Sequence, residues 1–349
     1  MVDGQYGKNL IDESLMRKKI KIGIIGCSTI AHNSTIPAIL KSTTSEVEVI
    51  GSRSKEKAKK FASEFGCKKY GSYEDVLNDS NVDIVYVSTP IGTHEEWVIK
   101  SAHAGKHIIC EKSSTISFES AKKMIKVCKE KKVRLMEGFM YRFHPSHQKV
   151  KQLINDGVMG ELFSFSSWYG FPPISKNNIR YEKSLGGGIL NDAGCYPINA
   201  SRMLFECEPE GILCNLVIDE EKKVDVKATV FMNFGKGRYS QCVLGYDLFY
   251  QSMYNLWGSE GFLSLTRSYN VPPDMQVTLD INSKIIQDKI SINVADHFEI
   301  MISSFINELQ KPNSSSYNFE SDLLNQARVM EAARVSYNEK RYVMINEIQ

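Results

Sequence analysis

Residues 20–31 read Ile-Lys-Ile-Gly-Ile-Ile-Gly-Cys-Ser-Thr-Ile-Ala, an apolar run that passes directly into a glycine turn. The run predicts a buried strand over Ile20–Ile25. Such a turn is where a dinucleotide-binding fold points backbone N–H groups at a pyrophosphate. Gly26 fills the first glycine position of that fingerprint, whereas Ser28 and Ala31 fill the second and third. The turn taken alone also fits an ordinary strand–turn–helix connection.

Short apolar runs alternate with amphipathic segments up to about residue 141. Further strands are predicted over residues 47–51, 84–88, 107–110 and 133–139. Helices are predicted between them, among others over residues 54–65 and 117–131, the latter with Ser117 as its N-cap. Strands that alternate with helices predict a doubly wound parallel sheet.

A different pattern begins after Tyr141. A helix over residues 147–156 and a strand over residues 162–169 lead to a glycine-rich loop and a helix, and several strands follow between residues 211 and 279. Their alternating apolar residues favour an antiparallel sheet. Two more helices are predicted over residues 295–310 and 320–338, and we expect the last one to pack back on the first domain.

These patterns predict an α/β protein in three parts. Residues 1–19 are expected to be a flexible extension, residues 20–141 a nucleotide-binding domain, and residues 142–349 a second α/β domain on an open, mainly antiparallel sheet. A chain of 349 residues is long enough for two cores.

The composition excludes several classes of protein. A formal net charge of +2 gives no electrostatic reason to expect nucleic acid or a membrane surface as partner. The eight cysteines show neither a Cys-x-x-Cys pair nor histidines at zinc-ligand spacing, so we expect no metal site and reduced thiols in a cytoplasmic protein. The first nineteen residues lack the apolar stretch of a signal peptide, and no segment is long enough to span a bilayer.

The tip of the second strand bears on which dinucleotide is bound. It reads Gly51-Ser52-Arg53-Ser54-Lys55, without the carboxylate that an NAD site needs for the ribose 2′-hydroxyl. Hydroxyl groups and cations suit a 2′-phosphate, because Arg grips it with two charge-assisted hydrogen bonds. The tip therefore favours NADP(H) over NAD, although Arg53 and Lys55 also fit the solvated start of a helix.

A second cluster of polar residues follows a run of three glycines. Asp192 and Tyr196 come four residues apart after Gly186-Gly187-Gly188, so in a helix both side chains project from one face. A helix-entry carboxylate and a core aromatic are the alternative readings. Glu111 and Lys112 end another predicted strand, at the edge where open α/β sheets bind ligands. His94 follows a third strand, where it either lines the cofactor cleft or caps the next helix.

Together these residues resemble the glucose-fructose oxidoreductase family, also called the Gfo/Idh/MocA family. The motifs that carry the resemblance are the first turn, Thr89-Pro90 through His94, Glu111-Lys112, residues 139–145, and the segment from Asp192 to Tyr196. The family implies a Rossmann domain followed by an α/β domain with an open sheet, a nicotinamide cofactor, and hydride transfer at a sugar or cyclitol carbon. Two positions depart from its pattern: Ser28 replaces a glycine, and Ser113 replaces the usual proline.

The resemblance also implies roles for residues. Lys112 lies next to the reacting oxygen, Tyr196 is the acid/base, and Asp192 orients substrate and lysine, with Arg180 as a further substrate contact. Cofactor contacts are expected from Gly26, Cys27, Ser28, Thr29, Ile30, Ser52, Arg53, Lys55, Thr89, Pro90, His94, Glu111 and Lys112.

Within the family, three segments are similar to enzymes that reduce a 3-keto group on a nucleotide-linked deoxysugar: residues 171–173, 178–181 and 269–273. Dehydrogenases of free sugars, cyclitols or dihydrodiols share most of the motifs and stay an alternative. A non-catalytic cofactor-binding regulator is a second alternative, which the presence of both Lys112 and Tyr196 disfavours. We expect a homodimer or a homotetramer, because an uncovered sheet face needs burial.

Overall fold

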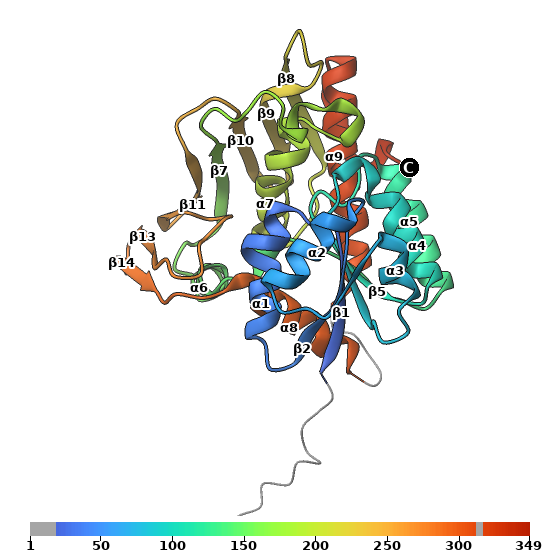
Figure 1. Cartoon of the computed structure of the whole chain (residues 1–349). Helices are drawn as coiled ribbons and strands as arrows, with labels where there is room; N and C mark the ends of the chain where they lie inside the picture. Colours follow the sequence, from blue (N-terminus) through green and yellow to red (C-terminus); the bar gives the residue numbers. More distant parts are fainter. Residues whose placement is uncertain (1–18, 312–316) are drawn as a thin grey trace, which may run out of the picture.

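The computed structural model describes residues 19–311 and 317–349, and two sheets stand side by side in it (Figure 1). The predicted N-terminal extension lies outside the described residues except for Lys19. Within the described ranges, no helix is long and apolar enough to cross a membrane.

The first sheet has six strands in the order β3-β2-β1-β4-β5-β6, and every neighbouring pair is parallel. This order confirms the predicted doubly wound sheet, with the topological switch between β1 and β4. The strands are β1 Ile20–Ile25, β2 Ser45–Gly51, β3 Lys69–Gly71, β4 Ile84–Val87, β5 His107–Cys110 and β6 Leu135–Glu137.

Two of these strands differ from the prediction. The three-residue edge strand β3 has exposed Lys69 and Tyr70 and no apolar run in the sequence to indicate it. Strand β6 is shorter than predicted, because Phe139 leads directly into the 3-10 turn η4, Met140–Phe143.

Helices cover both faces of the parallel sheet. The predicted cap is confirmed: Ser117 precedes α5 and accepts a hydrogen bond from the Ser120 amide. Ser54 caps α2 in the same way and accepts a hydrogen bond from the Lys57 amide. The helical elements are η2 Ala31–Thr35, α1 Ile36–Lys41, α2 Lys55–Glu64, α3 Tyr73–Asn78, η3 Ile91–Thr93, α4 His94–His103 and α5 Phe118–Glu130.

The second sheet has nine strands in the order β14-β13-β12-β11-β7-β10-β9-β8-β15. Only β7 and β10 pair in parallel among its described strands, so the mainly antiparallel prediction is confirmed. The strands are β7 Leu162–Gly170, β8 Gly211–Ile218, β9 Asp225–Asn233, β10 Tyr239–Gly245, β11 Gln251–Gly258, β12 Gly261–Thr266, β13 Val277–Ser283, β14 Gln287–Ile292 and β15 Val343–Met344.

The helices of the second half connect the two sheets. Figure 1 shows α9 running between the second sheet and the helices α4 and α5 of the first. Arg134 at the start of β6 donates to Glu320 of α9 at 2.8 Å, and Leu323 and Ala327 join the core beneath α5. The elements are α6 Pro145–Asn155, η5 Ile179–Tyr181, η6 Lys183–Leu185, η7 Leu190–Gly194, α7 Cys195–Phe205, α8 His297–Leu309, α9 Phe319–Glu339 and η8 Ile345–Glu347.

Buried histidines predict how stability depends on pH. Burial lowers the pKa of His147 to about 3 and that of His297 to about 3, against about 6.5 in an unfolded chain. Between these values the unfolded chain binds more protons than the folded one, so the free energy of unfolding falls as the pH drops.

We therefore expect acid to destabilise the wild type more than a variant without His147. Between pH 7.5 and 5.5 the wild type should lose about 1.4 kcal/mol more than H147Q, the contribution of one such histidine. Urea unfolding at both pH values measures this. The exposed His103 supplies the control, and H103Q should follow the wild type. Equal losses in wild type and H147Q would contradict the assignment.

Candidate active site

A cavity of about 290 Å³ lies where the carboxyl ends of β1, β4 and β5 face the loop that follows β7. It brings together most of the predicted residues. Those that line it are Ser28, Thr29, Ile30, Thr89, Pro90, His94, Glu111, Lys112, Arg180, Asp192 and Tyr196. The cavity lining does not include the remaining ones, which lie at the ends of β1 and β2: Gly26, Cys27, Ser52, Arg53 and Lys55.

Lys112, at the end of the parallel sheet, contacts residues of the second half of the chain. Its ammonium group donates to the main-chain oxygen of Asp192 at 2.6 Å and to the carboxylate Oδ1 at 3.3 Å. The same Nζ lies 4.8 Å from the centre of the Tyr196 ring. The two side chains predicted to project from one helical face therefore converge on this lysine.

The helix that carries them is irregular at its start. Asp192 lies in a single π-helical turn, η7, and the regular helix α7 begins only at Cys195. The Asp225 carboxylate of β9 accepts a hydrogen bond from the Leu190 amide at 2.6 Å. Gly188 has φ +116°, and a Cβ there would lie 2.1 Å from that carboxylate. A glycine is thus required where the loop enters the turn.

The Asp192 carboxylate is shared between two cations. Oδ1 faces Lys112, while Oδ2 accepts from Arg180 Nε at 2.5 Å and from the Tyr246 hydroxyl at 3.4 Å. Burial tends to raise the pKa of Asp192, but Lys112 and Arg180 outweigh it and hold that pKa below its ordinary value. Burial tends to lower the pKa of Lys112, yet the Asp192 carboxylate raises it overall. All three groups are therefore charged at neutral pH.

Tyr196 is surrounded by aromatic rings. The rings of Phe139, Tyr141, Tyr169 and Tyr269 lie within 5.8 Å of its ring, centre to centre. Burial raises the pKa of the Tyr196 hydroxyl well above its ordinary value, so the phenol keeps its proton. The hydroxyl donates to the Met140 thioether at 3.7 Å, a weak acceptor that a substrate oxygen can replace.

Further contacts hold the Lys112 loop in place. His94 is fully buried, with its ring nitrogens 2.7 Å from the Thr89 oxygen and 3.0 Å from the Ser113 oxygen. Burial lowers the pKa of His94 to about 4, although both carbonyls favour the charged ring. Ser113 also donates from Oγ to the Asn191 oxygen at 2.9 Å, and the peptide bond between Lys112 and Ser113 is cis.

Glu111 belongs to a separate buried chain of hydrogen bonds. Its carboxylate accepts from the Tyr86 hydroxyl, which in turn accepts from Thr35 at 2.8 Å. Burial raises the pKa of Glu111. Tyr86 could not be recognised as a partner from the sequence, because it lies within the apolar run of strand β4 and belongs to no motif.

The turn after β1 has the geometry that a dinucleotide needs. Gly26 has φ +107°, and a Cβ there would lie 3.0 Å from the backbone of Ser88. Ser28 accepts the Ala31 amide on its side-chain oxygen at 3.1 Å, and Ser52 is buried beside the turn. Arg53 is exposed just before Lys55, the first residue of α2. The residues present fit a nicotinamide dinucleotide with its phosphates along this edge.

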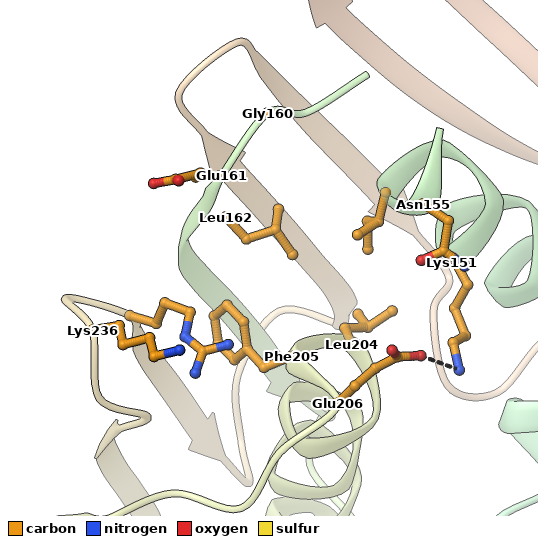
Figure 2. Close-up of a pocket in the computed structure, with 11 residues that line it drawn as sticks. Lys151, Asn155, Gly160, Glu161, Leu162, Leu204, Phe205, Glu206 and Lys236 are labelled. Carbon is orange, nitrogen blue, oxygen red and sulfur yellow. Dashed lines mark ion pairs between the residues drawn. The ribbon is translucent and has the colours of Figure 1, made fainter. Parts of the chain in front are cut away.

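Another cavity, of about 330 Å³, lies away from these residues at the ends of α6 and α7 (Figure 2). It contains the ion pair between Lys151 and Glu206, 2.9 Å apart, beside the apolar side chains of Leu162, Leu204 and Phe205. The predicted site residues do not line it, so the cavity around Lys112 is the candidate active site.

The chain is similar to proteins with assigned activities over most of its length. The chain is 31% identical to a dTDP-3,4-didehydro-2,6-dideoxy-alpha-D-glucose 3-reductase from Saccharopolyspora spinosa, over 84% of this chain and 89% of that protein. It is 32% identical to D-xylose 1-dehydrogenase (NADP(+)) 2 from Haloferax volcanii, over 72% of this chain and 77% of that protein.

A solved structure is similar over most of its length. It is KijD10, a 3-ketoreductase from Actinomadura kijaniata, in complex with NADP and TDP-benzene. The TM-score is 0.86 at 30% identity, covering 92% of this chain and 98% of that one.

Two family models match successive parts of the sequence. Residues 20–139 match the oxidoreductase family with an NAD-binding Rossmann fold, and residues 147–264 match the GFO/IDH/MocA C-terminal domain. The fold and these relatives agree with the resemblance seen in the sequence. The chain belongs to the Gfo/Idh/MocA family of oxidoreductases.

Proposed function

We propose that this protein is an NADPH-dependent oxidoreductase that reduces a keto group of a nucleotide-linked sugar. The observation that carries the proposal is the convergence of Lys112, Asp192 and Tyr196 in one cavity at the carboxyl edge of the parallel sheet. Relatives that are 3-reductases of dTDP-linked sugars, at 31% identity, support the substrate class.

NADP(H) is the cofactor that the residues fit best. The KijD10 structure contains NADP, and the tip of β2 in this chain offers Ser52 and Arg53 without a carboxylate. Gly26 would admit the pyrophosphate close to the backbone, and Thr89, Pro90 and His94, which line the cavity, would hold the nicotinamide. When bound, this cofactor supplies the hydride.

The chain's own residues would supply the proton and hold the sugar. The Tyr196 phenol is protonated, so it donates its proton to the carbonyl oxygen as that oxygen becomes an alkoxide. The Lys112 ammonium stabilises the developing negative charge, and Asp192 orients Lys112. Burial keeps the Tyr196 phenol protonated and the Asp192 carboxylate keeps Lys112 charged, so at neutral pH both donors are in the form that reduction requires.

The free thiols bear on the compartment of the protein, and the second sheet bears on its oligomeric state. All eight cysteines lie within the described residues and none forms a disulfide, which supports the reducing cytoplasm as its compartment. One face of the second sheet packs on α7, whereas no helix of the described residues covers the other face, which is called the open face below.

The open face carries a row of apolar side chains across six neighbouring strands, and five of the six side chains are exposed. Phe163, Trp257 and Phe262 are 49%, 58% and 40% exposed, and Phe163 contacts Trp257 with ring centres 6.1 Å apart. The exposed members are Leu213, Phe231, Phe163, Trp257 and Phe262, and the half-buried Tyr239 contacts the rings of Phe231 and Phe163. The side chains that point outward from these six strands, all within the described residues, are almost all uncharged, and Lys227 is the charged exception. Aromatic enrichment and a scarcity of charge are typical of interface cores, so we propose that a second copy covers this face.

The cofactor proposal predicts a selective loss in one variant. Arg53→Ala should weaken NADPH binding by about 1.5 to 3 kcal/mol, the range for a hydrogen bond to a charged group, and leave NADH binding nearly unchanged. Fluorescence titration of both cofactors measures this. A wild-type preference for NADH would refute the proposal.

The catalytic proposal predicts non-additive losses. Tyr196→Phe and Lys112→Ala should each lower turnover by roughly 10² to 10⁴, the scale for a positioned acid or oxyanion donor. Since both act on one oxygen, the double variant should lose much less than the product of the two effects. Steady-state rates with a nucleotide-linked keto sugar and with free sugars test this. Turnover of Tyr196→Phe within a few-fold of wild type would place the proton donor elsewhere.

The interface proposal predicts dissociation by a single charge. Trp257 is the most exposed member of the apolar row, so Trp257→Glu should convert dimers or tetramers into smaller species in light scattering at micromolar concentration. Ile285→Glu is the control, because Ile285 is 72% exposed in the turn between β13 and β14. A wild type that is monomeric at that concentration overturns the proposal.

A further inference from the structure

Arg180 has hydrogen-bonding capacity that the protein leaves unused. A guanidinium group carries five N–H donors in a rigid fork. Nε donates to Asp192 at 2.5 Å, and Nη1 makes only a long 3.5 Å contact with Asn178. In the described ranges no hydrogen-bond acceptor is found for Nη2. The side chain is 42% exposed and lines the cavity, so its terminal nitrogens are available to a bound molecule.

The charges of this cluster do not cancel. Lys112 and Arg180 share the single Asp192 carboxylate, which leaves one positive charge without a partner in the cluster. An uncharged sugar brings nothing to balance that charge. An anionic group on the substrate would balance the charge, and a phosphate matches the two-pronged geometry of arginine.

The spacing fits a phosphate on the anomeric carbon. Lys112 and Arg180 contact different oxygens of one carboxylate, at 3.3 and 2.5 Å. Their nitrogens are therefore within about 8 Å of each other, since a carboxylate is only about 2 Å across. In a 3-keto sugar, the carbonyl carbon and the phosphorus are separated by four bonds of about 1.5 Å each. One substrate can reach both cations.

The backbone holds Arg180 in this place. Its carbonyl oxygen accepts the Gly188 amide at 3.0 Å, and a Cβ on Gly187 would lie 2.5 Å from the same oxygen. The Asn178 side chain accepts the Arg180 amide at 3.0 Å. Two glycines of the loop thus allow the Arg180 segment to pack directly against the entrance to the Asp192 turn. This close approach explains why the glycine run precedes Asp192.

We propose that Arg180 is the specificity residue of the site: it binds the phosphate on the anomeric oxygen of the substrate while its Nε stays on Asp192. The substrate is then held at both ends, and its carbonyl is aligned with Lys112 and Tyr196. This inference rests on the proposed reduction of a nucleotide-linked sugar and assigns the contact with the anomeric phosphate to Arg180. A nucleoside diphosphate sugar and a sugar 1-phosphate share that chemistry.

Binding measurements test the inference without turnover. Calorimetric titration of thymidine diphosphate, thymidine and inorganic pyrophosphate into the NADP⁺-loaded protein separates the phosphates from the base. Arg180→Met should weaken thymidine diphosphate about 10- to 100-fold, the equivalent of a charge-assisted hydrogen bond, and Arg180→Lys should weaken it less. Thymidine binding should change less than threefold. Binding of pyrophosphate alone at comparable affinity favours a sugar 1-phosphate over a nucleotide sugar.

The matched control is Lys183→Met, which removes a cation from an exposed position on the same loop. It should bind thymidine diphosphate like the wild type. NADPH affinity should be unchanged in every variant, which reports correct folding. In turnover, Arg180→Met should reduce kcat/KM for the phosphate-bearing keto sugar at least tenfold more than for the free keto sugar.

The outcomes separate this inference from the proposed function. Equal thymidine diphosphate and pyrophosphate affinity in wild type and Arg180→Met, or an equal loss in Lys183→Met, overturns the role of Arg180 even if the enzyme reduces sugars. A loss confined to the Arg180 variants, in a protein that reduces no keto sugar with NADPH, supports the phosphate site and refutes the proposed reaction.

Discussion

One buried carboxylate, that of Asp192, holds together the groups that the proposed chemistry needs. It binds Lys112 from the end of the parallel sheet and Arg180 from the loop after β7, and its main-chain oxygen takes another hydrogen bond from Lys112. Without this carboxylate two like charges, the buried Lys112 and the partly exposed Arg180, would lie close together without a counter-charge, which is unfavourable. The ion cluster therefore constrains how the second domain sits against the first.

Distant parts of the chain fix Asp192 itself. Asp225 of β9 accepts the Leu190 amide at the start of η7, and Arg334 of α9 donates to the Asn191 side chain at 2.8 Å. Ser113 donates to the Asn191 main chain from the other side. A substitution at Asp225 or Arg334 would thus act on the reaction through the position of Asp192, although neither side chain lines the cavity.

The parts of the site that follow local rules could be predicted from the sequence. A four-residue spacing put Asp192 and Tyr196 on one face, and the end of a parallel strand placed Lys112 at the ligand-binding edge. The π-helical turn and the Asp225 and Tyr246 contacts could not be predicted, because they depend on strands that follow later in the chain and carry no motif. Strand β3 could not be predicted, because it is defined by its pairing with β2 at the edge of the sheet and has no apolar run. The roles of Arg53 and the other cofactor residues, and the domain boundary at residue 141, stay predictions.

The central claim is that hydride from NADPH reaches a sugar carbonyl held between Lys112 and Tyr196. Its most direct test is reduction of a dTDP-linked 3-keto deoxysugar with NADPH deuterated at the reactive C4 position, followed by mass spectrometry and NMR of the product. The account predicts one deuterium, on the former carbonyl carbon, in wild type and almost none in the Lys112→Ala Tyr196→Phe double variant over the same time. A product without deuterium, or label at another carbon, would contradict it.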